Sequence, residues 1–167
     1  FHSAPKPLPK RAVTHDWQSF LGPTHNMFST ETALLREFPK AGLKPVWEMK
    51  KGDGFAAPAI AGERLILFHW VGGEEVIDCV HPLDGRRYWQ FRYASAYRDR
   101  YGFNPGPRAS PVIADGRVFT LGAGGWLHCL DLATGQMRWQ RELLTEFKIE
   151  QNFFGVAATP LVTGDKL

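Results

Sequence analysis

The chain has 167 residues, 44% of them hydrophobic and 22% charged, which is the length and composition of one globular domain and excludes a disordered chain. Its formal net charge of +3 comes from scattered basic residues, which excludes the dense basic stripe of a dedicated nucleic-acid-binding protein. No apolar run approaches the roughly 20 residues of a membrane-spanning helix.

Residues 1–15 are predicted to form a Pro-rich tail or linker. The stretch Ala4–Arg11 combines prolines with basic residues, and proline favours an extended backbone that cannot donate the hydrogen bonds of a sheet. Because the chain begins with Phe1, we expect an upstream segment, such as a signal peptide, to have been removed or left out. Ordered structure is expected from Asp16 onward.

From Pro45 onward the chain repeats itself. Residues 57–66 and 110–119 share the same order of a small residue, a proline, two apolar residues, a turn and an apolar strand. A third copy begins at residue 159. Three further pairs of residues are each separated by 50 positions, namely Cys79 and Cys129, Gly85 and Gly135, and Trp89 and Trp139.

Each repeat is predicted to contain four short strands, in keeping with the many aromatic residues, glycines and prolines. In the second repeat the expected strands are Ser110–Ile113, Arg117–Leu121, Trp126–Leu130 and Gln136–Arg141. The Gly-containing turns between them are of hairpin length, so the strands should be antiparallel. Because one such sheet cannot bury both of its faces, the repeats predict an all-β fold, a β-propeller of four-stranded antiparallel blades.

The segment Leu130–Trp139 resembles the blade-end motif of the PQQ-like, quinoprotein-type propeller repeat. In that motif an Asp and a Thr-Gly turn join the third and fourth strands, and the Trp packs between neighbouring blades. Residues 80–89 are a drifted copy in which His81 replaces the Asp and is expected to bond the turn backbone. The resemblance identifies seven structural positions: Trp47, Gly85, Trp89, Asp131, Thr134, Gly135 and Trp139.

The resemblance extends over about residues 16–167, and the opening Asp16–Pro23 is similar to the start of secreted bacterial members of the family. It implies about two and a half blades of a seven- or eight-bladed ring. The implied parts are a blade-closing strand at about 45–51, blades at about 55–93 and 109–143, and the start of another blade at 158–167. We expect the chain to be the N-terminal part of a longer protein, with an oligomeric ring of such chains as the alternative.

Two of the connections between blades are about ten residues longer than the first, and they are rich in Arg, Tyr and Phe. Such loops on a rigid scaffold suit partner binding, while capping of the propeller face is the alternative. The candidate binding residues are Tyr97, Arg98, Arg100 and Tyr101 in the first loop, Asn152, Phe153 and Phe154 in the second, and His69 and Trp70 at a strand end.

A quinone cofactor is the main alternative that the family raises. Its dehydrogenases hold PQQ and calcium with a Trp floor, an adjacent-cysteine disulfide and an Arg, but this chain has no adjacent cysteines. Asn104 and Arg108 are the candidates for such a site. Cys79 and Cys129 are expected to be buried, inert thiols, with a disulfide between blades as the alternative. We predict no catalytic residue and no metal site, and we expect no cofactor unless the chain is a dehydrogenase.

The resemblance therefore implies an exported bacterial protein, periplasmic or secreted. We predict a non-catalytic binding or assembly scaffold that recognises a protein or another ligand through its loop face. Its partner would be another protein or the remaining blades of the same chain; we expect neither nucleic acid nor a transmembrane segment. The alternatives are a periplasmic PQQ-dependent dehydrogenase of alcohols or sugars, and an accessory subunit of a larger membrane-associated complex.

Overall fold

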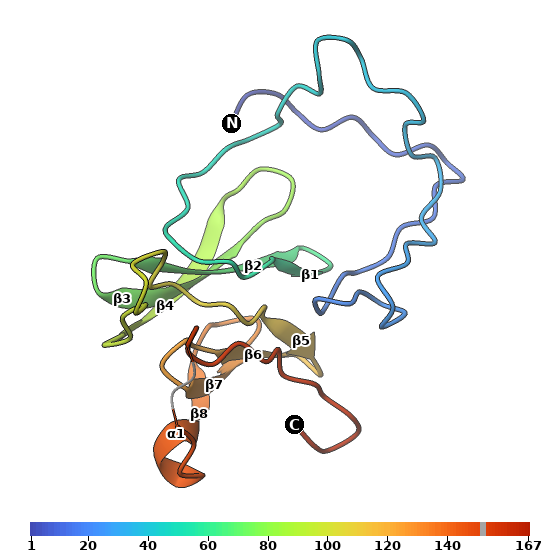
Figure 1. Ribbon diagram of the computed structural model, residues 1–167. Helices are drawn as coiled ribbons and strands as arrows, with labels where there is room; N and C mark the ends of the chain where they lie inside the picture. Colours follow the sequence, from blue (N-terminus) through green and yellow to red (C-terminus); the bar gives the residue numbers. More distant parts are fainter. Residues whose placement is uncertain (151–152) are drawn as a thin grey trace.

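The computed structural model describes residues 1–150 and 153–167. Within these residues, the strands form two four-stranded antiparallel sheets, each in sequential order. The first sheet contains β1 (Ala59–Ala61), β2 (Arg64–Val71), β3 (Glu74–Val80) and β4 (Arg87–Ala94). The second contains β5 (Val112–Ala114), β6 (Arg117–Leu121), β7 (Trp126–Asp131) and β8 (Met137–Glu142), and is followed by the short helix α1 (Leu143–Glu146). Figure 1 shows the two sheets one above the other.

The predicted all-β architecture of four-stranded blades is confirmed. The four strands expected in the second repeat are all present, within two residues of the predicted bounds. Their order follows from local turn chemistry. Between β5 and β6, Asp115 and Gly116 have φ values of +49° and +69°, which is the backbone of a tight two-residue hairpin turn.

The internal repeat is conserved in the strand register as well as in the sequence. Cys79 pairs with Trp89 across β3 and β4, and Cys129 pairs with Trp139 across β7 and β8. Each of these cysteines is followed at once by a shift of register, the mark of a β-bulge. The two blades therefore share one backbone plan.

The core lies between the two sheets. Apolar residues of β2 and β3 on one face of the first blade meet those of β5, β6 and β7 on the facing side of the second. The buried cluster includes Ile66, Phe68, Ile77, Ile113, Val118 and Leu130. Removing this apolar surface from water, at about 25 cal/mol per Å², is the main contribution that holds the blades together.

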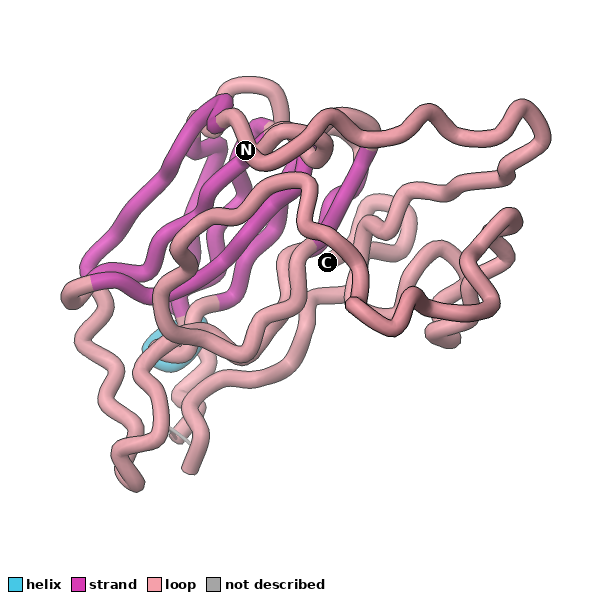
Figure 2. Tube along the Cα trace, turned by 90° about the horizontal axis from the view of Figure 1, so that it is seen from above, coloured by secondary structure: helices cyan, strands magenta, loops and turns pink. Residues whose placement is uncertain are grey.

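The opening segment is tied to both blades although it contains no long strand. Trp17 exchanges two backbone hydrogen bonds with Ile60 of β1, of 3.0 and 2.8 Å, and Gln18 accepts one of 2.8 Å from Ile113 of β5. The remainder of residues 1–50 forms the wide loop beside the sheets in Figure 1. Seen from above, the strands gather on one side of the molecule and loops extend far beyond them (Figure 2).

Residues 45–51, expected as a blade-closing strand, form no strand in the structure. A strand needs a neighbour that supplies hydrogen-bond partners, and none of the described residues forms a ladder with this segment. Among the described residues, backbone bonds to it come from His2 and Ser3, which both donate to the carbonyl oxygen of Val46. Among the helices of the described residues, none has the length and apolar character needed to cross a membrane.

Candidate functional site

The blade-end motif joins each blade to its neighbour through a tryptophan and a glycine. The indole N–H of Trp89 donates to the carbonyl oxygen of Leu132 over 2.9 Å, and a Cβ added to Gly135 would lie 2.5 Å from the Trp89 ring. Trp47 repeats the arrangement in the first blade: its N–H donates to the carbonyl oxygen of Pro82 over 2.8 Å, and a Cβ added to Gly85 would lie 2.7 Å from its ring. Glycine is required because any side chain would displace the ring.

The turn that presents Gly135 is held by the carboxylate of Asp131. Its Oδ1 atom accepts hydrogen bonds from the backbone N–H groups of Ala133 and Thr134 and from the Thr134 hydroxyl. Its Oδ2 lies 2.6 Å from the guanidinium of Arg138. These donors, Arg138 first, lower the pKa of Asp131 to about 2, so the turn keeps its charge across the physiological range. In the first blade, His81 fills the same role by accepting from the backbone N–H of Leu83.

Trp139 occupies the equivalent position in the second blade but differs in its surroundings. It packs against Phe119, with ring centroids 6.0 Å apart, and remains 37% exposed. Within the described part of the chain its indole N–H has no hydrogen-bond acceptor. Trp47 and Trp89 therefore each make the hydrogen bond of the blade-end motif, whereas Trp139 makes none with a described residue.

The first long interblade loop is fixed at its base by a buried ion pair. The Arg108 guanidinium lies 2.6 Å from Oδ2 of Asp99, and both side chains are more than nine-tenths buried. Arg108 also donates to the carbonyl oxygen of Gly106 and lies over the Tyr97 ring, 4.9 Å from its centroid. Breaking such a buried pair is expensive, so the loop has a well-defined base.

The second long loop is anchored through Glu75, which faces the second blade from the start of β3. One carboxylate oxygen accepts the backbone N–H of Ala123 over 2.9 Å, and the other accepts the hydroxyl of Tyr93. Ala123 in turn accepts the N–H of Val156, at the base of the second loop, over 2.9 Å. Burial raises the pKa of Glu75, although the bonds from Tyr93 and Ala123 act in the opposite direction.

Above these anchors the two loops bring their aromatic rings together. Tyr101 stacks on Phe153, with centroids 5.7 Å apart and planes inclined by 16°, and contacts Phe103 and Phe154 at 6.3 and 6.4 Å. The four residues are 53% to 73% exposed. We refer to Tyr101, Phe103, Phe153 and Phe154 as the aromatic loop surface. A contiguous exposed patch of this kind is typical of an interaction site.

The structure separates the candidate binding residues into exposed and buried groups. Arg98, Arg100, Tyr101, Phe153 and Phe154 are exposed, whereas Asn152 lies outside the described residues. The prediction missed Phe103, which a Tyr-x-Phe spacing in the same loop could have indicated. It also missed Glu75, because a lone acidic residue in a strand gives no signal of its buried partners.

Tyr97 and His69, which were predicted as contact residues, are buried in the structure. The Tyr97 ring packs beneath Arg108, so it belongs to the base of the loop. The Nδ1 atom of His69 accepts the N–H of Gly52, and its Nε2 lies 2.9 Å from Asp78, so both ring nitrogens are engaged. Trp70 is half-buried, and its backbone pairs with Asp53.

The residues proposed for a quinone site do not fit that role. Arg108 is committed to Asp99, and the side-chain oxygen of Asn104 accepts the backbone N–H of Gly106 over 2.8 Å. Cys79 and Cys129 are free, buried thiols on equivalent faces of different blades, and burial raises the pKa of Cys79 to about 12. Within the described residues, no group of three or more His, Cys, Asp or Glu could hold a metal ion.

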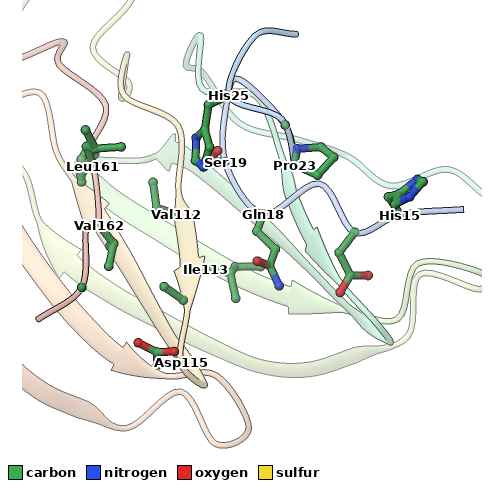
Figure 3. Close-up of a pocket in the computed structure, with 15 residues that line it drawn as sticks. His15, Gln18, Ser19, Pro23, His25, Val112, Ile113, Asp115, Leu161 and Val162 are labelled. Carbon is green, nitrogen blue, oxygen red and sulfur yellow. The ribbon is translucent and has the colours of Figure 1, made fainter. Parts of the chain in front are cut away.

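A separate pocket of about 530 Å³ lies between the opening segment, β5 and residues 160–164. Figure 3 shows His25 beside Ser19, with His15 and Asp115 at distant edges and Gln18 between them. The titratable groups therefore do not converge on a common point. The pocket is lined by both polar and apolar residues, but its titratable side chains are not arranged for acid–base or nucleophilic chemistry.

Comparison with known proteins identifies relatives of the chain. The family model described as outer membrane protein assembly factor BamB matches residues 72–167, while no curated protein matches. Among solved structures, BamB from Moraxella catarrhalis is 27% identical, with a TM-score of 0.44, over 58% of this chain. Quinohemoprotein alcohol dehydrogenase ADHIIG from Pseudomonas putida HK5 is 19% identical, with a TM-score of 0.46, over 71% of this chain. The chain spans only 26% and 17% of these two proteins.

Proposed function

Because the chain belongs to the PQQ-like repeat family described as outer membrane protein assembly factor BamB, we propose that it acts as a non-catalytic binding scaffold in the bacterial cell envelope. In this role it recognises a protein partner through the loops between its blades and contributes to the assembly of outer membrane proteins. The blades supply a rigid frame, and the loops supply the contacts.

The observation that carries the proposal is the aromatic loop surface. Its four rings come from two loops about 50 residues apart, yet they contact one another and remain more than half exposed. Apolar rings that the chain itself leaves in water gain free energy when a partner covers them, about 1.5–3 kcal/mol for a fully buried aromatic side chain. Aromatic residues are also the commonest energetic centres of protein interfaces.

The rigid base beneath the rings supports the same function. The Asp99–Arg108 ion pair holds the first loop, and the Glu75–Ala123–Val156 chain of hydrogen bonds holds the second. A surface that is already ordered before binding loses less conformational entropy when the partner arrives. The arrangement therefore favours recognition over the flexible closure that catalysis often needs.

The test uses the full-length protein in its native host, in a strain that lacks the wild-type copy. We expect a Tyr101→Ala, Phe154→Ala variant to lower the amount of folded β-barrel protein in the outer membrane, measured by heat-modifiable migration on gels. The matched control is Phe28→Ala, Phe38→Ala, which removes two comparably exposed rings from the opening segment. Normal barrel assembly in the first variant, with normal protein levels, would contradict the proposal.

A further inference from the structure

On the premise of the proposed function, we infer that the aromatic loop surface takes an acidic polypeptide segment carrying at least one large apolar side chain. The inference specifies the chemical character of the partner that this surface binds. It rests on three features: the arrangement of the rings, the sign of the exposed charge on the first loop, and a small hollow in that loop.

The rings form one continuous apolar patch centred on Tyr101. Phe103 and Phe154 are each inclined by 40° to the Tyr101 ring, so the patch is curved. A curved apolar patch accommodates a branched or aromatic side chain that inserts between the rings. Single-stranded nucleic acid instead requires separate ring faces on which successive bases stack, and it is usually bound in a strongly basic groove.

The exposed charge of the first loop is entirely positive. Its one carboxylate, Asp99, has both oxygens engaged, by Arg108 and by the backbone N–H of Tyr101. Arg98 and Arg100 on either side of it are exposed and form no salt bridge with any described residue. On the second loop, the exposed Lys148 and Glu150 offset each other. The first loop therefore carries two guanidinium groups with no carboxylate partner among the described residues, and guanidinium groups bind carboxylates in a fixed, bidentate geometry.

A hollow of about 240 Å³ lies in the same loop that carries Tyr101 and Phe103, and it is lined by Arg98, Asp99, Gly102, Asn104 and Pro105. The Asn104 side-chain oxygen is occupied by Gly106, so its amide N–H₂ group remains a donor. With the Asp99 carboxylate engaged, Arg98 and Asn104 present donors to this space. A hollow that presents donors is complementary to the carboxylate of an Asp or Glu side chain.

The test presents the purified full-length protein to a random phage-displayed dodecapeptide library. We expect enriched peptides to carry more Asp and Glu than Lys and Arg, together with a Leu or an aromatic residue. The best peptide is then synthesised with a fluorescein label, and its affinity is measured by anisotropy. Tyr101→Ala should weaken binding about tenfold or more, and Arg98→Glu, Arg100→Glu should weaken it several-fold in low salt.

The control Lys6→Glu, Lys10→Glu makes the same change of charge on the tail and should leave binding unchanged. Circular dichroism establishes that each variant is folded. Failure to enrich any peptide, enrichment of neutral or basic peptides, or unaltered binding by the Arg98, Arg100 variant would overturn the inference. Tighter binding of a fluorescein-labelled single-stranded oligonucleotide would do the same.

The two proposals fail in different ways. If the Tyr101, Phe154 variant impairs barrel assembly but Arg98→Glu, Arg100→Glu does not, the scaffold function stands and the acidic partner is wrong. If acidic peptides bind at the surface but neither variant alters barrel assembly, the surface chemistry stands and the proposed function is wrong.

Discussion

Gly135 combines two demands that only glycine meets together. Its φ of +73° is costly for other residues, by about 1–2 kcal/mol, and its Cα faces the Trp89 ring with no room for a Cβ. We expect Gly135→Ala to lower the free energy of unfolding by this cost of the backbone conformation. Displacement of the Trp89 ring at the blade interface should lower it by about 1–3 kcal/mol more. Urea denaturation followed by circular dichroism measures the loss.

Gly116 provides the matched control for this prediction. Its φ is +69°, but nothing lies within 4 Å of where its Cβ would be. Gly116→Ala therefore reports the backbone cost alone, and the difference between the two variants isolates the contact between blades. Equal losses in the two variants would show that the ring does not press on Gly135.

Some individual residues could be assigned a role from the sequence, and others could not. The 50-residue spacing pointed to Trp89 and Gly135 as motif residues, because a repeated turn needs the same chemistry each time. The burial of Tyr97 and His69 could not be predicted, because their covering groups lie elsewhere in the chain. For His69 the covering group is Gly52, and for Tyr97 it is Gly155, whose missing side chain leaves room for the Tyr97 ring.

At the scale of elements, the start of β3 connects the first blade to the base of the second long loop through Glu75. Because burial raises the Glu75 pKa, the folded state favours its protonated form. The stability that this preference gives is fully present below the pKa of Glu in the unfolded chain, about 4.3. It is lost as the pH rises through the pKa of Glu75 in the folded state. Glu75→Gln cannot ionise, so its thermal stability relative to wild type should increase from pH 5 to pH 8, as measured by melting temperature.

The neighbouring Glu74 is the control, since it is partly exposed and pairs with Arg92 at the surface. Glu74→Gln, measured over the same pH range, shows what removal of an exposed carboxyl group at the same strand end does to the melting temperature. The other groups around Glu75 are Tyr93, Arg108 and, behind Tyr93, His128, whose pKa burial lowers to about 4. Burial also raises the pKa of Tyr93, so neither Tyr93 nor His128 changes its charge between pH 5 and pH 8. A flat difference for Glu75→Gln would mean that its carboxyl group is not destabilised by burial.

Strands and turns were predictable because their signals are local. Apolar strand segments and Gly-containing hairpins give β5–β8 directly from the sequence. The segment 45–51 shows the limit of this reasoning: Trp47 docks on the first blade as its motif requires, yet the segment forms no strand without a pairing partner. The meeting of the two long loops was equally hidden, because it depends on how the blades stack.

At the scale of the whole molecule, the two blades described by the structure pack face to face, as neighbouring units of a repeat protein do. Such arrays unfold cooperatively only while the contacts between units are strong. Here an apolar cluster lies between the sheets, and hydrogen bonds cross from one blade to the other, among them those from the Trp89 indole to Leu132 and from Ala123 to Glu75. Loss of the Trp89 bond should therefore weaken the coupling of the blades without emptying the core.

Trp89→Phe tests this coupling, because phenylalanine keeps an aromatic ring against Gly135 but cannot donate to the Leu132 carbonyl oxygen. In the 167-residue chain we expect a loss of about 1 kcal/mol in the free energy of unfolding and a broader urea transition by circular dichroism. Trp139→Phe is the matched variant one repeat later, where the indole N–H has no acceptor among the described residues, so it should cost less. Equal losses from the two changes would mean that the ring, and not its hydrogen bond, couples the blades.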